Sequence, residues 1–178
     1  MAIVVEDGTG LSNADSYQSV ADAGTYIGSY MTAANEAIWA ALTTAEQELA
    51  CRLATQYLDA VYGSVWRGYR TNEVQALDWP RSDVYDSDGY AVDNDVLPTA
   101  LLQAHAEIAF RSGNGETLLP DRSSPVGDLS KERVKVGPIE VETSFAGSAS
   151  VGPKFYDVVD RLLDPIIDGS LFARVERA

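Results

Sequence analysis

Residues 64–81 restrict the possible folds more than any other part of the chain, because they place two tryptophans and three arginines in a segment without regular periodicity. A tryptophan side chain is large and costly to expose, so two of them predict a loop fixed onto a core. Pro80 interrupts any helix and favours an extended Trp79. Arginines beside aromatic rings can stack on them while pairing with carboxylates. The sequence therefore predicts a packed structural corner formed by Trp66, Arg67, Trp79, Pro80 and Arg81.

The same stretch has an alternative interpretation as a platform for single-stranded DNA. Aromatic rings stack on bases and arginines pair with phosphates. The residues of such a platform would be Trp66, Tyr69 and Trp79 with Arg67, Arg70 and Arg81. Three arginines would give a salt-dependence slope of only about −2, so binding would be weak. The packed corner is the preferred interpretation.

The distribution of charge limits the possible partners. The net charge is −14, and residues 1–63 carry eight acids against Arg52 alone, while residues 82–129 carry nine acids against two arginines. Residues 64–81 and 130–178 are close to neutral. An acidic surface repels phosphate, so general nucleic-acid binding by a monomer is not expected.

Length and composition predict one compact domain with a substantial core. The chain has 178 residues, of which 46% are hydrophobic and 22% are charged. No apolar run is long enough to span a bilayer, and the N-terminus lacks the pattern of a secretory signal, so no membrane partner is expected. Cys51, the single cysteine, excludes an internal disulfide and indicates a buried thiol in a reducing compartment.

Helical periodicity dominates the first two thirds of the chain. An extended N-terminal arm over residues 1–18 precedes a helix that follows Ser19, with an apolar stripe of Val20, Ala23, Ile27, Tyr30 and Met31. A short helical segment is anchored by Trp39 and Leu42. The clearest helix covers residues 45–62, with Thr44 and Gln47 as a capping box and a broad apolar face. The expected face comprises Leu49, Leu53, Tyr57, Ala60 and Val61, widened by Ala50, Ala54 and Leu58.

The second half of this helical region begins with a turn. Residues 83–90 resemble a calcium loop in composition, but Val84 would occupy its first position and Asp95 its twelfth. They therefore predict an Asp-Gly turn between short extended segments. Pro98 opens a further helix to about Arg111, with Asp95 as a possible cap. Glycine, serine, proline and aspartate then predict a long surface loop over residues 113–130.

Residues 131–145 predict a β-hairpin around a Gly-Pro turn. In this hairpin Val134 and Val136 face Ile139 and Val141, with bases on one strand and acids on the other. An isolated hairpin is marginal in water, so it must pack on the helices or add to a neighbouring subunit.

A last helix covers about residues 154–163, with Phe155, Val158, Val159, Leu162 and Leu163 as its apolar stripe, and Pro165 ends or kinks it. The tail alternates like a strand, which suggests docking. The expected subunit or partner interface comprises Val134, Val136, Ile139, Val141, Leu171, Phe172, Arg174 and Arg177.

These patterns predict a mainly α fold: a compact helical bundle with a β-hairpin and extended N- and C-terminal arms. The single domain, 1–178, comprises an N-terminal arm (1–18), a helical body (19–112), a loop (113–130), the hairpin (131–145) and a C-terminal helix and tail (154–178).

No catalytic, cofactor-binding or metal-binding constellation is evident. A nucleophilic triad needs an activated serine or cysteine with a base in reach, whereas His105 and Cys51 lie on separate helices without a supporting signature. A lone histidine is more often a satisfied helix residue than a ligand. The sequence therefore predicts a protein that is not an enzyme and has no cofactor.

One motif, Gln-Ala-Leu-x-Trp-Pro-Arg at residues 75–81, is fairly specific, and it stands in a fixed order with residues 4–11, 14–17, 39, 53–59, 66–68, 88–89, 97–98 and 136–139. This order of segments resembles that of the head–tail adaptor (connector) proteins of tailed phages, which often carry the label "DnaT-like ssDNA-binding". The resemblance covers nearly the whole chain and is weaker after Pro165.

The resemblance implies a virion structural protein at the head–tail junction, made in the host bacterial cytoplasm. It implies a homo-oligomeric ring of about twelve subunits, with the portal protein on one side and a tail-side connector or tail-completion protein on the other. DNA would pass through the lumen without specific binding, because an acidic lumen offers phosphate no cations. We expect the C-terminal segment to engage the portal, and deletion of residues 166–178 to abolish that docking while the helical fold stays intact.

Overall fold

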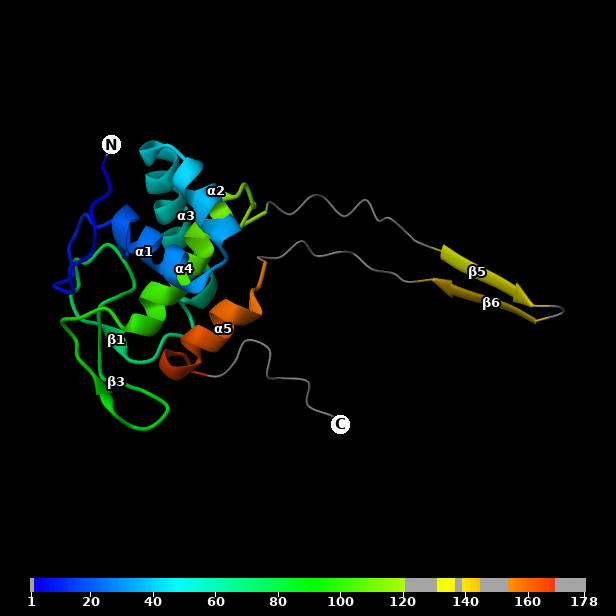
Figure 1. The fold of residues 1–178 in the computed structure, drawn as a ribbon. Coiled ribbons are helices and arrows are strands. Elements are labelled where there is room, and N and C mark those ends of the chain that lie inside the picture. The colour runs from blue at the N-terminus through cyan, green and yellow to red at the C-terminus, as the bar shows by residue number, and fades with distance from the viewer. Residues whose placement is uncertain (1, 121–130, 137–138, 145–153, 169–178) are drawn as a thin grey trace. The chain divides into compact units, whose positions relative to one another are not determined.

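The computed structural model describes residues 2–120, 131–136, 139–144 and 154–168 (Figure 1). The chain divides into two compact units, residues 1–118 with 155–178 and residues 119–154, and each is described separately. The helices of the first unit are α1 (Val20–Tyr30), α2 (Ala33–Ala41), α3 (Thr44–Tyr62), α4 (Thr99–Gly113), α5 (Asp157–Leu163) and the 3-10 helix η1 (Asp164–Ile166). Its strands are β1 (Tyr69–Arg70), β2 (Arg81–Ser82), β3 (Val84–Tyr85) and β4 (Ala91–Val92). This mainly α architecture confirms the predicted fold class.

The core of the first unit is built around the pairing of α3 with α4. Helix α4 also contacts α1, α2 and α5, so it lies at the centre of the bundle (Figure 1). Its side chains are buried from Ala104 to Phe110 without interruption. A helix that is buried on most sides cannot show a narrow apolar stripe, and α4 includes a buried histidine and a buried glutamate. None of the described helices could cross a membrane.

Helix α3 begins one residue earlier than the sequence analysis predicted. Thr43 is the N-cap, and it forms a capping box with Glu46 instead of the expected Thr44–Gln47 pair. The Thr43 backbone N–H donates to the Glu46 carboxylate at 2.8 Å, while the Glu46 N–H donates to Thr43 Oγ1 at 3.3 Å. A carboxylate accepts more strongly than an amide and is favoured at the positive end of the helix. The Thr43 hydroxyl, which donates to the Glu46 carboxylate at 2.7 Å, and then the Thr43 N–H lower the pKa of Glu46.

The buried face of α3 also differs from the expected one. Leu49 and Leu53 are 52% and 37% exposed, so their assignment to the core was wrong. The buried side is turned towards Cys51, Thr55 and Tyr62. Its remaining members, Ala50, Ala54, Tyr57 and Leu58, were predicted correctly. The apolar pattern of α3 is so broad that periodicity alone does not determine which edge faces α4.

Helices α1 and α2 form a tight pair at the start of the bundle. Helix α1 begins after Ser19 as predicted, and Ser19 is its N-cap, accepting a hydrogen bond from the Asp22 N–H at 3.1 Å. Ala23 and Ile27 are fully buried, whereas Tyr30, which was expected in the same apolar stripe, is 70% exposed. Trp39 of α2 is 5% exposed and packs beside α1, which accounts for its predicted anchoring role.

The N-terminal segment is irregular, as expected, but it is packed onto the body rather than extended away from it. The Glu6 carboxylate is 3% exposed and accepts hydrogen bonds from the backbone N–H groups of Gly8, Gly10 and Leu11 at 2.9–3.0 Å. Gly8 has φ +97°, and a Cβ there would lie 2.0 Å from the Asp95 carbonyl oxygen. Only glycine allows this conformation and this approach together.

The short strands follow α3 and form two small hairpins. Strand β1 pairs with β2, and β3 pairs with β4, both antiparallel. Asp88 and Gly89 form the turn between β3 and β4, and the Asp86 carboxylate accepts from the N–H groups of Asp88 and Tyr90. This confirms the predicted Asp-Gly turn between short extended segments.

Helices α4 and α5 begin differently from the prediction. Pro98 is the N-cap of α4 and no side chain caps it, so Asp95 does not have the capping role considered for it. Helix α5 begins at Asp157 rather than near Lys154, with Val159 and Leu163 as its buried residues from the expected stripe. Phe155 and Val158 are 44% and 37% exposed. The chain continues past Pro165 as the 3-10 helix η1, which agrees with the predicted break.

The second unit contains the predicted β-hairpin, formed by β5 (Lys131–Val136) and β6 (Ile139–Ser144). Its antiparallel register pairs Val134 with Val141 and Val136 with Ile139, as expected. The same register pairs the basic residues of β5 with acids of β6, Lys135 with Glu140 and Arg133 with Glu142. Much of the predicted loop, at residues 121–130, and the tail after Asp168 lie outside the described residues.

Candidate functional site

The tryptophan corner, defined as Trp66, Arg67, Trp79, Pro80 and Arg81, lies where the end of α3 meets β1 and β2. Trp66 and Trp79 are 5% and 0% exposed, and their rings meet edge to face with centroids 5.8 Å apart. The contact extends into the core through Tyr62, whose ring lies 5.6 Å from that of Trp66. Such aromatic pairs add to the stabilisation from burial. Neither indole ring is open to a base in this conformation.

Arg81 holds the corner together from inside. It is 8% exposed, and its guanidinium donates to the carbonyl oxygens of Arg67 at 2.7 Å, Gly68 at 2.7 Å and Asp78 at 3.3 Å. The backbone can approach this closely at Gly68, which has φ +67° and no Cβ to collide with the Ser82 carbonyl. Buried carbonyl groups need hydrogen-bond donors, and the planar guanidinium group can donate to several of them at once.

Arg67 ties the corner to the C-terminal part of the first unit. Its guanidinium donates to the carbonyl oxygens of Tyr85 at 2.9 Å and Pro165 at 2.8 Å, and to the Asp168 carboxylate at 3.3 Å. The expectation that these arginines would stack on rings and pair with carboxylates was therefore mostly wrong. Most N–H groups of Arg67 and Arg81 donate to backbone carbonyl oxygens instead. The irregular chain leaves those carbonyl groups without the partners that a helix or sheet would supply.

Gln75 is a functional part of the corner that the sequence analysis did not single out. Its side chain is 3% exposed, and its amide nitrogen donates to the carbonyl oxygens of Leu77 at 2.8 Å and Pro80 at 3.1 Å. Its amide oxygen accepts from the Asn72 N–H at 2.8 Å. A glutamine at the start of the 75–81 motif supplies both a donor and an acceptor, which was the available signal.

The remaining residues of the alternative DNA platform are more exposed. Tyr69 is 62% exposed, and Arg70 is exposed and donates to the Gln75 carbonyl oxygen at 3.3 Å. The structure thus brings all six platform residues into one region but buries both tryptophans and Arg81. Of these six residues, only Tyr69 and Arg70 are exposed.

A half-buried carboxylate, that of Asp59 in α3, links the corner to the N-terminal segment. It accepts a hydrogen bond from the Tyr17 hydroxyl and, at 3.4 Å, one from the Asp78 backbone N–H. Burial is the main cause that raises the pKa of Asp59 to about 7, and the nearby Asp78 carboxylate adds to it. Burial also raises the pKa of Asp78, while Arg81 and Arg70 oppose that rise. Asp59 and Asp78 therefore join α3, the N-terminal segment and the corner, and both carboxyl groups bind a proton more tightly than usual.

His105 is a buried helix residue, in line with the expectation for a lone histidine. It is fully buried, and its Nε2 lies 3.0 Å from the Cys51 carbonyl oxygen and 3.1 Å from Thr55 Oγ1. Since a carbonyl only accepts, Nε2 carries the hydrogen. Burial lowers the pKa of His105 to about 4, so the ring is neutral at pH 7. Cys51 is also fully buried, and burial raises its thiol pKa to about 12.

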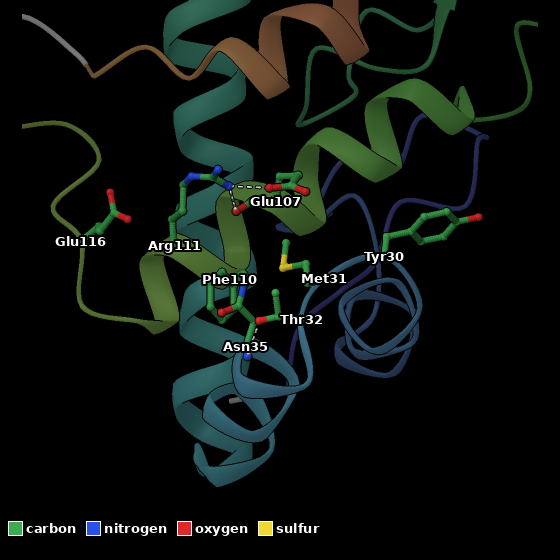
Figure 2. Close-up of a pocket in the computed structure, with 8 residues that line it drawn as sticks. All are labelled: Tyr30, Met31, Thr32, Asn35, Glu107, Phe110, Arg111 and Glu116. Atoms are coloured by element: carbon green, nitrogen blue, oxygen red, sulfur yellow. Dashed lines mark hydrogen bonds and ion pairs between the residues drawn. The ribbon is translucent and has the colours of Figure 1, made fainter.

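A hollow of about 520 Å³ lies in the first unit, between the α1–α2 turn and the last turns of α4. It is lined by Tyr30, Met31, Thr32, Asn35, Glu107, Phe110, Arg111 and Glu116 (Figure 2). We refer to it as the α2–α4 hollow. The sequence analysis placed no site here, because its residues come from three separated segments and share no local motif.

The polar groups of the α2–α4 hollow are arranged around Arg111. Its guanidinium donates to the Glu107 carboxylate at 2.6 Å and to the Glu107 carbonyl oxygen at 2.8 Å, and it lies over the ring of Tyr156. The Tyr156 hydroxyl donates to Glu116 at 3.1 Å. Within the part of the chain that the structure describes, no group of three or more residues could hold a metal ion.

The expected interface residues fall into two sets. Val134, Val136, Ile139 and Val141 lie in β5 and β6 of the second unit. The tail set, Leu171, Phe172, Arg174 and Arg177, lies outside the described residues.

Comparison with known proteins gives one match. Comparisons with curated proteins and with solved structures find no significant match. A family model described as "Putative DnaT-like ssDNA binding protein" matches residues 1–178, the whole chain. The chain therefore belongs to the DnaT-like family that this model defines.

Proposed function

We propose that the protein is a structural head–tail adaptor of a tailed bacteriophage, a ring subunit between the portal and the tail-side connector. The proposal starts from the resemblance of the chain to such adaptors over nearly its whole length. It places the protein in the virion, at the head–tail junction, after synthesis in the host bacterial cytoplasm. In this role the molecule acts through its shape and its contacts with other proteins.

The observation that carries the proposal is the state of the tryptophan corner. The residues best suited to grip a polynucleotide are instead used to brace the fold. Trp79 is fully buried, and Arg81 donates to three backbone carbonyl oxygens. A tryptophan corner that is packed in this way suits a subunit whose contacts with neighbours depend on fixed geometry. It does not suit a flexible strand-binding groove, where aromatic rings must be accessible.

The charge of the chain supports passage of DNA rather than its capture. The net charge is −14, so the protein offers few cations that could neutralise DNA phosphates and release their counterions. A ring lined by such a surface would let DNA move through its lumen without adhering. The ring would be a homo-oligomer of about twelve subunits with heterologous contacts between neighbours.

The portal contact is assigned to the C-terminal segment, with Leu171, Phe172, Arg174 and Arg177 as its docking residues. The deletion that tests it must begin at residue 169, not at 166. Ile166 and Ile167 are buried, and the Asp168 N–H donates to the Val65 carbonyl oxygen at 2.7 Å. Removing residues 166–168 would therefore damage the core as well as the docking segment.

The experiment is electron microscopy of the purified protein mixed with its portal protein. We expect rings of the full-length protein on the portal, and no such rings for the variant that lacks residues 169–178. Circular dichroism of the variant should match that of the full-length protein, because its described body is intact. Absence of rings from the full-length sample, or unimpaired docking of the deletion variant, would contradict this assignment.

A second candidate, single-stranded DNA binding, is favoured by the family description. Tyr69 and Arg70 are its accessible residues, and Arg67 is less suitable for a test because it braces the fold. A fluorescence anisotropy titration with labelled single-stranded DNA at low salt tests this function. Sub-micromolar binding that is lost in Tyr69→Ala/Arg70→Ala would establish it over the adaptor role. We expect no such binding, since one ring and one guanidinium supply too few contacts.

A further inference from the structure

We propose that the α2–α4 hollow receives the Lys131–Val136 strand (β5) of a second copy of this chain. This inference rests on the proposed ring function and identifies the lateral contact between neighbouring subunits. The hollow and the strand are different surfaces of the same protein, so the contact is heterologous. A heterologous contact repeated around an axis closes into a ring if the rotation allows it.

The shape of the hollow fits a segment that has both apolar and charged side chains. Met31 lies at its centre, between the α1–α2 turn and α4, and Phe110 is 8% exposed in its wall (Figure 2). Asn35 and Thr32 lie along one edge, and Tyr30 points outward and is 70% exposed. An incoming segment would cover apolar surface at the centre and meet polar groups at the edge, which is the usual anatomy of a protein interface.

The charge of the hollow favours a basic occupant. Its lining has two carboxylates, Glu107 and Glu116, against the single guanidinium of Arg111. Glu107 is paired with that guanidinium and Glu116 accepts from the Tyr156 hydroxyl, so two carboxylates against one guanidinium leave the lining with a net charge of −1. These residues also lie in and after the last turns of α4, where the helix dipole favours positive charge.

The second unit has the complementary charge. Residues 119–154 carry five acids and five bases, so the whole net charge of −14 falls on the other residues. Within it, β5 contains Lys131, Arg133 and Lys135 against Glu132 alone, together with Val134 and Val136. Complementary potentials of this kind steer association and fix its register.

The hairpin also needs additional contacts. It is a two-stranded sheet in which β5 pairs only with β6 among the described residues, and a two-stranded sheet is marginally stable in water without cover. Docking into a neighbour would supply that cover. The basic strand is the part of the hairpin that matches the acidic hollow.

A charge-swap experiment tests the contact on the full-length protein. Asn35→Lys puts a positive charge in the hollow, and Lys131→Glu replaces a positive charge of β5 with a negative one. The register places Ser144, not an acid, opposite residue 131. Self-association is measured by sedimentation velocity up to about 1 mM, where contacts of about 4 kcal/mol are populated. Asn35→Gln and Lys131→Gln are the matched controls, and circular dichroism checks the fold of each variant.

We expect each charge variant to associate at least about tenfold more weakly than the wild type, a change of about 1.4 kcal/mol. An equimolar mixture of the two should recover most of the lost association. In the mixture each hairpin can meet a hollow of opposite charge, which neither variant offers to itself. The glutamine controls should weaken association less than the charge reversals, and added salt should weaken the wild type.

Two results would overturn the inference. One is a wild type that stays monomeric up to about 1 mM, where even weak contacts are populated, as expected if a different protein fills the hollow. The other is a mixture that associates no better than either variant alone, as expected if the hairpin docks within its own chain. Both results leave the adaptor role to be judged from the images on the portal. Failure of the wild type to form rings there would contradict the function and not the measured self-association.

Discussion

The tryptophan corner and the α2–α4 hollow both combine aromatic rings with arginine, yet they differ in what those groups face. In the corner, Trp79 is fully buried and the Arg81 donors end on backbone carbonyl oxygens. In the hollow, Tyr30 is 70% exposed and points outward, while the Arg111 guanidinium donates to the Glu107 carboxylate (Figure 2). The two tryptophans and Arg81, whose composition suggests a binding platform, are therefore used inside the fold, and only Tyr69 and Arg70 of that platform are exposed.

The difference teaches how an irregular segment can be held in place. A loop without ladder hydrogen bonds leaves many carbonyl groups unpaired, and buried ones must find donors. Arg81, Arg67 and Gln75 supply those donors in the corner. The α2–α4 hollow is bordered by helices that satisfy their own backbone groups, so its charged side chains bond to one another and to Tyr156 rather than to open carbonyl groups.

The largest expected effect is that of Trp79→Ala. The side chain is fully buried, and its removal leaves a cavity beside Trp66, so we expect a loss of about 3–5 kcal/mol in the free energy of unfolding. Urea denaturation followed by circular dichroism measures it, with Trp79→Phe as the milder control. A loss below about 1 kcal/mol would mean that the corner is not part of the core.

Arg81→Lys tests the hydrogen bonds of the corner. One ammonium cannot reach the carbonyl oxygens of Arg67, Gly68 and Asp78 together, so we expect a loss of about 2–3 kcal/mol. The matched control is Arg70→Lys, because Arg70 is exposed and has one bond of 3.3 Å to a carbonyl oxygen. Equal losses for the two variants would show that burial of the guanidinium is not what matters.

Much of the fold could be predicted because local signals agreed with tertiary packing. Short patterns predicted the start of α1 after Ser19, the anchoring by Trp39, the Asp-Gly turn and the hairpin register. The exposure of Leu49 and Leu53 could not be predicted, because it depends on where α4 lies against α3. The packed N-terminal segment escaped notice for a similar reason, since its contact with Asp95 joins residues far apart in sequence.

The candidate sites divide in the same way. The corner was predictable because one continuous stretch supplies its aromatic and basic residues. The partners of its arginines were not, because they depend on which carbonyl groups the loop leaves open. The α2–α4 hollow combines residues from the α1–α2 turn, α4 and the following loop, and no spacing in the sequence reveals that meeting.

Asp59→Asn tests the junction between the corner and the N-terminal segment through its pH dependence. The folded-state pKa of Asp59, about 7, lies above its ordinary value of 3.8, so the folded protein holds a proton that the unfolded chain has lost. In the wild type this group makes stability fall as pH rises from about 4 to about 7. The free energy of unfolding of the variant, minus that of the wild type, should rise by about 2 kcal/mol between pH 5 and pH 8.

Subtraction of the wild type is needed because other groups also titrate in that range. Burial raises the pKa of Asp160 and Asp78, which acts in the same direction as Asp59. Burial of neutral His105, with a pKa of about 4, acts in the opposite direction, because the unfolded chain binds a proton there below about 6.5. A difference that does not change with pH would show that Asp59 is ionised in the folded protein throughout.

Tyr30→Ala should have the smallest effect on stability. The side chain is 70% exposed, and its main contact is a stacked ring, Tyr26, with centroids 4.9 Å apart. Exposed substitutions of this kind change the free energy of unfolding by about 0.5 kcal/mol or less, and denaturation under the conditions used for Trp79→Ala measures it. A loss as large as that of Trp79→Ala would show that Tyr30 is part of the folded core. The contrast between a buried corner and a hollow that is accessible to a partner would then fail.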